Sequence, residues 1–264
     1  MVSTGTGIGM NIIDTHCHLD VEEFDSDRDQ VIDSCLKAGV DKIVVPAISA
    51  PGWDALLSLC ARYPQHLFPA LGCHPIYIDQ HQEQDLALLQ NKAQENRPLA
   101  IGEIGLDFYI QDLDRSRQQA FFEAQVSIAN DVDLPIIVHV RKAHDQVIST
   151  LKKTRNRGGI IHAFNGSRQQ AMQYIDLGFK LGFGGTMTYS HSNKIRKLAK
   201  DLPMDAIVLE TDAPDMTVAS HRGERNSPEY LPECLHALAE IRNQPVDQVA
   251  LATTNNARDI LRLP

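Results

Sequence analysis

The sequence lacks the features of a disulfide-rich, thiolate-metal or membrane protein. Its five cysteines are widely spaced and include no CxxC pair, which argues against a disulfide framework and against a zinc site built from thiolates. Such cysteines are typical of reduced thiols, so we expect a cytoplasmic protein. No apolar run approaches the roughly 20 residues that span a bilayer, and we expect no membrane partner.

Positive charge is also scarce. The chain has 25 lysines and arginines against 34 aspartates and glutamates, which gives a formal net charge of -9. Proteins that bind nucleic acid only by neutralising its phosphates are usually basic. If this chain binds nucleic acid, something other than bulk positive charge has to hold the phosphate, and a bound divalent cation could do so.

The length of the chain indicates one large domain. Its 264 residues, 43% of them hydrophobic, are enough for a single core. We find no linker, repeat or low-complexity tract, so we assign one domain to residues 10–264. Residues 1–9 contain no basic residue and no apolar core, so they are not a signal peptide. We expect them to be a disordered extension, with Met10 as the natural start.

Short apolar runs alternate with longer amphipathic stretches. The runs are typical of buried strands and lie at residues 11–14, 42–46, 67–71, 99–102, 135–139, 159–162, 180–184 and 206–210. Helical periodicity predicts helices at residues 28–38, 53–63, 84–96, 115–131, 144–155, 168–177, 193–202, 231–241 and 246–261. Apolar strands that alternate with helices favour a parallel sheet covered on both faces. About eight such units predict an α/β fold of the (β/α)8 TIM barrel type.

Polar residues stand out at the ends of the predicted strands, where barrel enzymes carry their catalytic groups. They are His16 and His18 after the first strand, His74 after the third, Glu103 after the fourth, His139 and His162 closing the fifth and sixth, and Asp212 after the eighth. Because side chains alternate along a strand, His16 and His18 should point the same way and Cys17 the other way. Cys17 is therefore expected to pack in the core.

Four of these histidines and the two carboxylates form a candidate metal site. The set comprises His16, His18, His139, His162, Glu103 and Asp212. Imidazole and carboxylate without thiolate suit Zn²⁺, Mn²⁺ or Mg²⁺. Six ligands exceed the need of one catalytic zinc and fit two ions bridged by a carboxylate, for which Glu103 is the natural choice.

Each of these residues also has an interpretation that involves no metal. A lone HxH motif is a weak signal, and a single histidine at a strand end is often a hydrogen-bonded core residue. Glu103 could pair with an arginine, and Asp212 before Ala213 and Pro214 could cap a turn. These interpretations would all have to hold at the same end of the barrel, where unpartnered ionisable groups are costly to bury. We therefore predict a metal site.

Seven motifs now identify a resemblance that runs from about residue 11 to the C-terminus. They are, in order, DTHCHLD, GCHP, GEIGLDFY, PIIVHVR, HAFNGS, GFGGTMTY and ETDAPDM. Together they resemble the TatD family of metal-dependent hydrolases, within the amidohydrolase superfamily of TIM barrels. The runs ETDAPDM and GGTMTYSHSNKIRK are most similar to the YjjV branch of that family.

The resemblance implies a site with two divalent metal ions, Mg²⁺, Mn²⁺ or Zn²⁺. The implied ligands are His16, His18 and Asp212 for one ion, His139 and His162 for the other, and Glu103 between them. It implies a deoxyribonuclease, commonly a 3′→5′ exonuclease, that cleaves single-stranded DNA or RNA with a metal-activated water. Asp212 would accept the proton of that water. The alternative is hydrolysis of a small ester, lactone, amide or phosphoester at the same site. We expect a monomer.

Further residues match family positions around the pocket. His74 and Arg141 would donate to the substrate, although His74 could be a turn residue and Arg141 a surface ion-pair partner. Asp107 and Glu210 would support the ligands from outside the metal shell, and Asp107 could instead cap a turn. One departure is that Ser227 stands where many family members have the acid of an RNEP sequence.

Three aromatic residues are relevant to base stacking. Trp53 lies in a predicted helix and is expected to pack in the core. Phe108 and Tyr109 follow the strand of the bridging acid, where they could stack on a base or pack under the loop.

Overall fold

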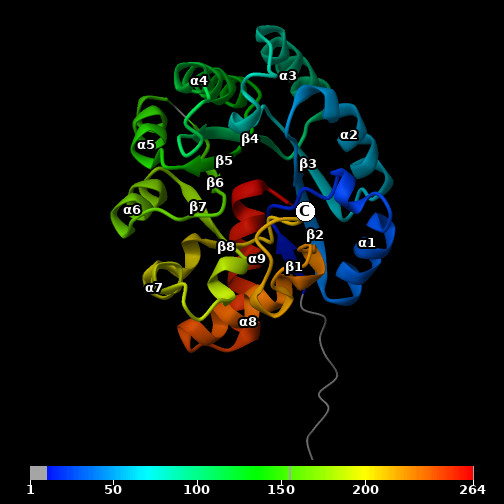
Figure 1. Cartoon of the computed structure of the whole chain (residues 1–264), viewed down its shortest axis with the longest axis vertical. Helices are drawn as coiled ribbons and strands as arrows, with labels where there is room; N and C mark the ends of the chain where they lie inside the picture. The colour runs from blue at the N-terminus through cyan, green and yellow to red at the C-terminus, as the bar shows by residue number, and fades with distance from the viewer. Residues whose placement is uncertain (1–10, 155, 264) are drawn as a thin grey trace, which may run out of the picture.

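The computed structural model describes residues 11–154 and 156–263. Eight parallel strands alternate with helices in it (Figure 1). Three predictions fall outside the described residues: the extension at residues 1–9, the start at Met10, and the last residue of the fifth predicted helix, at position 155.

The eight strands pair in chain order, each one parallel to the next. They are β1 Ile12–Asp14, β2 Val40–Pro46, β3 Leu67–Leu71, β4 Ala100–Asp107, β5 Ile136–Arg141, β6 Gly159–Ile161, β7 Phe179–Phe183 and β8 Ile207–Leu209. The backbone N–H of Thr15, just after β1, donates to the carbonyl of Leu209 at the end of β8 over 3.0 Å. This bond brings the first strand against the last, so the predicted (β/α)8 barrel is confirmed as a nearly closed one.

An outer ring of helices surrounds the strands in Figure 1. The helices of this ring are α1 Arg28–Lys37, α2 Trp53–Arg62, α3 Glu83–Asn96, α4 Arg115–Asp131, α5 His144–Lys153, α6 Arg168–Asp176, α7 Asn193–Asp201 and α8 Leu231–Arg242, and α9 Val246–Leu261 lies apart from it. Gly39 after α1 and Gly178 after α6 both have φ of +86°. This is the left-handed conformation in which many helices end, and glycine adopts it without steric cost.

The last helix, α9, closes the barrel at the N-terminal ends of the strands. One apolar cluster joins Ala257, Leu261 and Leu263 to inward-facing residues of seven strands, which are Ile13, Val44, Ala70, Ala100, Ile137, Ile160 and Val208. Figure 1, viewed down the barrel, shows α9 inside the ring of strands. Each buried Val, Leu or Ile side chain in such a cluster contributes roughly 1.5–3 kcal/mol. With this end filled by apolar side chains, the polar residues occupy the opposite end.

Strand β4 is longer than predicted. It spans Ala100–Asp107, so the prediction that Glu103 follows the fourth strand is wrong, and Glu103 lies within it. Gly102 and Gly105 interrupt the apolar run, yet Gly105 keeps its pairing with His139. At its φ of +144°, a Cβ on Gly105 would lie only 3.0 Å from the carbonyl carbon of His139. The glycine lets β4 and β5 approach closely, and β5 likewise continues past His139, to Arg141.

Other side chains behave as predicted for a packed core. Trp53 is completely buried, and its indole N–H donates to the carbonyl of Gly72 over 3.2 Å, so it is a core residue. All five cysteines are buried and free. Among the described residues, no helix combines the length and the apolar character needed to cross a bilayer.

Candidate metal centre

Two histidines follow β1 and point into the C-terminal mouth of the barrel. The Nε2 atoms of His16 and His18 lie 3.3 Å apart, while Cys17 between them packs in the hydrophobic core. The predicted alternation of the three side chains is confirmed. His16 is completely buried and His18 is partly exposed, so the pair leads from the barrel interior toward solvent.

The carboxylate of Glu103 lies between two pairs of imidazoles. Its Oε2 atom is 3.0 Å from Nε2 of His16 and 3.4 Å from Nε2 of His18. Its Oε1 atom is 2.9 Å from Nδ1 of His139 and 3.6 Å from Nε2 of His162. Of these four rings, Oε2 therefore faces the two that follow β1, and Oε1 faces the ring on β5 and the ring after β6.

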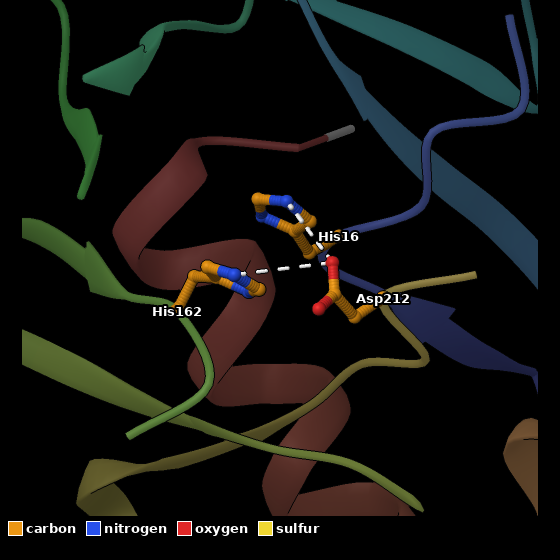
Figure 2. A group of neighbouring side chains, drawn as sticks. All are labelled: His16, His162 and Asp212. Carbon is orange, nitrogen blue, oxygen red and sulfur yellow. Dashed lines mark ion pairs between the residues drawn. The ribbon is translucent and has the colours of Figure 1, made fainter. Parts of the chain in front are cut away.

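Asp212 completes the group from the loop after β8. Its Oδ1 atom is 3.7 Å from Nε2 of His16 and 3.9 Å from Nε2 of both His18 and His162. Figure 2 shows the rings of His16 and His162 beside this carboxylate. The backbone N–H of Asp212 donates to the carbonyl of His16 over 2.8 Å. Its φ of +57° is left-handed, a conformation that Asp adopts more readily than most residues.

The outward-facing nitrogens of two of these histidines have carboxylate neighbours. Nε2 of His139 lies 3.0 Å from Oδ2 of Asp107, and Nδ1 of His162 lies 3.3 Å from Oε1 of Glu210. Asp107 also accepts the backbone N–H of Tyr109 on its Oδ1 atom over 2.9 Å. The carboxylates fix the orientation of the two rings, as outer-shell acids do around metal sites. Asp107 therefore both contacts the His139 ring and caps the turn that contains Tyr109, as its two interpretations predicted.

His74 reaches Glu103 as a hydrogen-bond donor. Its Nδ1 atom accepts the backbone N–H of Ile76 over 3.1 Å, so the neutral ring carries its proton on Nε2. That Nε2 atom is 3.2 Å from Oε1 of Glu103. A protonated nitrogen donates to an oxygen and does not bind a cation, which separates His74 from the other four histidines. His74 is also the N-cap of the short 3-10 helix Pro75–Tyr77, so its turn interpretation holds as well.

The donor set fits divalent cations. Within the described residues, His16, His18 and Glu103 form one of several groups whose ligand atoms all lie within 4.8 Å of one another. Oε2 of Glu103 is buried and makes no hydrogen bond within the described chain, despite the imidazole nitrogens close to it. Burying an ionised carboxylate without a hydrogen bond is costly. A cation among these nitrogen and oxygen atoms removes that cost, and the ligand types are those of Zn²⁺, Mn²⁺ and Mg²⁺.

The two carboxylates have opposite pKa shifts. Burial alone would raise the pKa of Glu103, but the neighbouring imidazoles, His74 and His16 first, outweigh it and hold that pKa well below its ordinary value. Burial raises the pKa of Asp212 to about 6, against the lowering effect of His162. Glu103 is thus a permanent anion, and Asp212 titrates close to neutral pH.

The imidazoles of the cluster differ in pKa. Burial and the charge of His162 hold the pKa of His16 well below its ordinary value. Burial also opposes the charged form of His18, but Glu103 raises its pKa to about 9. The charge of Asp212 likewise overcomes burial and raises the pKa of His162 to about 10. Without a cation, protons therefore occupy part of this ligand set at neutral pH.

Two buried residues that sequence reasoning did not select hold the ligand-bearing loops together. Asp14 accepts the backbone N–H groups of His16 over 3.1 Å and Thr211 over 3.0 Å. Asn226 donates from Nδ2 to the carbonyls of Thr211 over 2.9 Å and Asp215 over 2.7 Å. An acid within the apolar strand β1 was the available signal for Asp14, whereas nothing local marks Asn226.

Ser227, which stands in place of the family acid, is buried beside the short helix Pro228–Tyr230. Its Oγ atom has no hydrogen-bond partner among the described residues. The preceding Arg225 forms a bidentate pair with Asp27 at 2.9 Å and 2.7 Å. The loop after β8 is therefore tied to the segment before α1 through Arg225, and Ser227 adds no contact to the metal cluster.

A cavity of about 730 Å³ opens over the cluster. Its lining includes Glu103 and Asp212 together with apolar side chains such as Ile48 and Phe164. Arg141 is the one arginine or lysine among the described residues of the lining. It is exposed, and its guanidinium lies 3.7 Å from the centre of the Tyr109 ring. The surface ion pair considered for Arg141 is absent from the part of the chain that the structure describes.

Comparison with known proteins places the chain in a family. The sequence profile of the TatD related DNases matches residues 13–262. The uncharacterized metal-dependent hydrolase YjjV of Escherichia coli K12 is 40% identical over 256 residues, which cover 96% of this chain and 98% of the relative. This chain belongs to the TatD family of metal-dependent hydrolases. The resemblance that the seven motifs carry is therefore confirmed.

The crystal structure of this relative and the sequence of one further TatD protein extend the comparison. The crystal structure of YjjV, a TatD homolog from Escherichia coli K12, has a TM-score of 0.92 at 39% identity and covers 97% of this chain and 99% of its own. A protein of Erwinia tasmaniensis named 3′-5′ ssDNA/RNA exonuclease TatD is 30% identical over 263 residues, covering 97% of this chain and 99% of the relative. The TatD likeness thus extends over nearly the whole barrel.

Proposed function

We propose that this TatD protein is a divalent-metal-dependent nuclease that removes nucleotides from the 3′ end of single-stranded DNA or RNA. The observation that carries the proposal is the position of Glu103, whose Oε2 atom faces His16 and His18 and whose Oε1 atom faces His139 and His162, with the donor His74 also beside Oε1. A carboxylate placed between these imidazoles could be shared by two cations. The name of the Erwinia tasmaniensis relative, a 3′-5′ exonuclease on ssDNA and RNA, supports the choice of substrate.

The proposed ligands divide into two sets that share Glu103. They are His16, His18 and Asp212 for one ion, His139 and His162 for the other, and Glu103 for both. His162 also lies with His16 and Asp212 in one compact group of ligand atoms, so the two sets are adjacent. Divalent ions such as Mg²⁺, Mn²⁺ or Zn²⁺ bound there supply a lowered water pKa and neutralise negative charge on phosphate oxygens. They also give an acidic protein the local positive charge that phosphate binding needs.

Asp212 is the proposed proton acceptor. With no cation bound, burial raises its pKa to about 6, so the carboxylate is already ionised at neutral pH, as a proton acceptor has to be. Its side chain is 16% exposed, and Asp212 lines the cavity, so it reaches the space that a substrate would fill. Glu103 is 1% exposed and stays an anion throughout, which suits a ligand and not a base.

His74 and Arg141 are the proposed donors to the phosphate. Both line the cavity. The bond that Nδ1 of His74 accepts from Ile76 fixes the proton on Nε2, and this proton would pass from Oε1 of Glu103, 3.2 Å away, to the bound phosphate. Arg141 brings a permanent positive charge to the rim. Negative charge that builds up on the phosphate oxygens during hydrolysis would be stabilised by these groups. Asp107 and Glu210 would hold the rings of their histidines in place.

A small-molecule ester or phosphoester is the second candidate. The apolar part of the cavity lining, which includes Ile48, Ile76, Phe164 and Phe183, favours it, because a small organic substrate could be enclosed there. An exonuclease must instead leave one side of the cavity open to the rest of the strand. The fold and metal ligands do not choose between these substrates.

The test is a substrate panel with matched variants. Purified protein loaded with Mn²⁺ or Mg²⁺ is incubated with 5′-labelled and 3′-labelled single-stranded oligonucleotides, and with small esters and phosphoesters. We expect stepwise loss of nucleotides from the 3′ end that EDTA abolishes. Glu103→Gln should be inactive, while Glu123→Gln, at an exposed glutamate on α4, should match the wild type. Turnover of the small substrates with intact oligonucleotides would overturn the nuclease proposal in favour of the alternative.

A further inference from the structure

An exposed aromatic ring lies beside the mouth of the cavity. Tyr109 is 54% exposed and is the one aromatic among the large apolar side chains that the described residues leave exposed. Its neighbour Phe108 packs against the core and lies 4.9 Å from the guanidinium of Arg115. The structure thus separates the two aromatics: Phe108 packs under the loop, and Tyr109 is free to contact a ligand.

Arg141 covers one face of this ring. Its guanidinium lies 3.7 Å from the centre of the Tyr109 ring, a cation–π distance. Stacked in this way, the guanidinium keeps its N–H groups at the edge of its plane, where they can donate to a phosphate. The Tyr109 ring offers its remaining surface to a second planar group.

The Tyr109–Arg141 pair is connected to the candidate metal centre through Asp107. Asp107 pairs with Arg141 in the β4–β5 register, and its Oδ1 accepts the N–H of Tyr109 over 2.9 Å. The other oxygen of the same carboxylate holds Nε2 of His139 at 3.0 Å. Arg141 follows His139 by two residues on β5, so both point to the same face about 7 Å apart. The Tyr109 ring and the Arg141 guanidinium therefore lie at a fixed, short distance from the candidate metal ligands.

We propose that Tyr109 and Arg141 form a subsite that binds the nucleotide next to the scissile phosphate, with the base stacked on Tyr109 and the phosphate held by Arg141. This inference rests on the proposed nuclease function and names how that function selects its substrate. A stacked base must be unpaired and turned out of a duplex, so the subsite selects single strands. Stacking on an aromatic ring accepts every base, so no sequence preference arises here.

The test combines variants with a modified substrate. Tyr109→Leu removes the ring, and Tyr109→Phe retains it. Tyr63→Leu is the matched control, because Tyr63 follows α2 at the opposite end of the barrel and is also paired with an arginine, Arg62, at 5.3 Å. Steady-state kinetics are measured on a single-stranded oligonucleotide and on the same strand with abasic residues at its 3′ end.

Loss of one stacked base should raise KM roughly 5- to 100-fold. We expect this rise for Tyr109→Leu on the normal strand, with kcat little changed, and wild-type values for Tyr109→Phe and Tyr63→Leu. On the abasic strand, wild type and Tyr109→Leu should have the same raised KM. Equal KM values for wild type and Tyr109→Leu on the normal strand would overturn the proposed subsite but not the nuclease function. The same holds if Tyr109→Leu raises KM on the abasic strand as much as it does on the normal strand. A wild type that leaves all oligonucleotides intact would overturn the proposed function itself.

Discussion

Replacing Gly182 by alanine should weaken the metal centre without touching any ligand. Gly182 lies in β7 and faces the carboxylate of Glu210. A Cβ at this position would lie 2.5 Å from Cδ and 2.7 Å from Oε1 of Glu210, and closer still to Oε2. These separations are far below van der Waals contact, and β7 is paired on both sides. The carboxylate of Glu210 therefore has to move, and with it the partner of Nδ1 of His162.

The expected effect of Gly182→Ala has two parts, a loss of metal affinity and a loss of folding stability. Loss of an outer-shell partner lowers metal affinity about 10- to 100-fold, which corresponds to about 1.4–2.8 kcal/mol of binding free energy. Overpacking of a filled site lowers the free energy of unfolding by a further 1–3 kcal/mol or so. Since alanine is otherwise at least as well tolerated as glycine in a strand, neither effect is expected from the change in residue type.

Metal titration by calorimetry and thermal unfolding of the metal-free protein measure these two quantities. Gly52→Ala is the control, because a Cβ there meets nothing within 4 Å. If the clash acts through Glu210, adding Gly182→Ala to a Glu210→Ala background should cost no further affinity, because the smaller side chain leaves room. Additive losses in the double variant, or unchanged affinity in Gly182→Ala, would refute this reasoning.

Three other predictions concern protons and hydrogen bonds in and around the candidate metal centre, and the first refers to the metal-free protein. Burial raises the pKa of Asp14 to about 8 from an unfolded value of 3.8, so the folded state binds the extra proton. The free energy of unfolding should therefore fall as pH rises from about 4 to about 8, and Asp14→Asn should flatten this dependence in denaturant titrations. His18 and His162, with pKa values of about 9 and about 10, carry protons at pH 7. Metal binding should release them, and calorimetry in buffers of different ionisation enthalpy would detect zero release if the assignment is wrong. Because Nδ1 of His74 accepts from Ile76, His74→Ala should keep the wild-type metal content in elemental analysis while activity falls. A lost metal ion would show that His74 is a ligand.

The barrel and most of the metal cluster could be predicted because their signals are local. Apolar runs of strand length mark the sheet, and period-2 alternation places His16 and His18 on one face with Cys17 on the other. The rule that barrel enzymes carry polar groups at strand C-termini then gathers residues from six strands. The extension of β4 beyond Gly102 was missed, since glycines break the apolar pattern while the backbone pairing continues.

The supporting contacts could not be predicted, because they join distant segments. Asp14 and Thr211 are 197 residues apart in sequence, and only barrel closure brings them into contact. The Tyr109–Arg141 pair depends on the β4–β5 register, which a sequence does not specify. The position of α9 was missed for another reason. Its residue pattern is amphipathic like that of the outer helices, and nothing in it distinguishes a helix that fills the barrel from one that covers it.

That last helix has a consequence for how the protein is made. Leu261 and Leu263 belong to the cluster that fills the N-terminal end of the barrel, so residues translated after all eight strands are needed to complete the interior. Until they emerge, apolar side chains of seven strands have no cover. Premature termination or trimming of the last turn would leave a water-exposed hydrophobic opening and invite aggregation. Deletions that remove Leu261 and Leu263 should therefore be poorly tolerated.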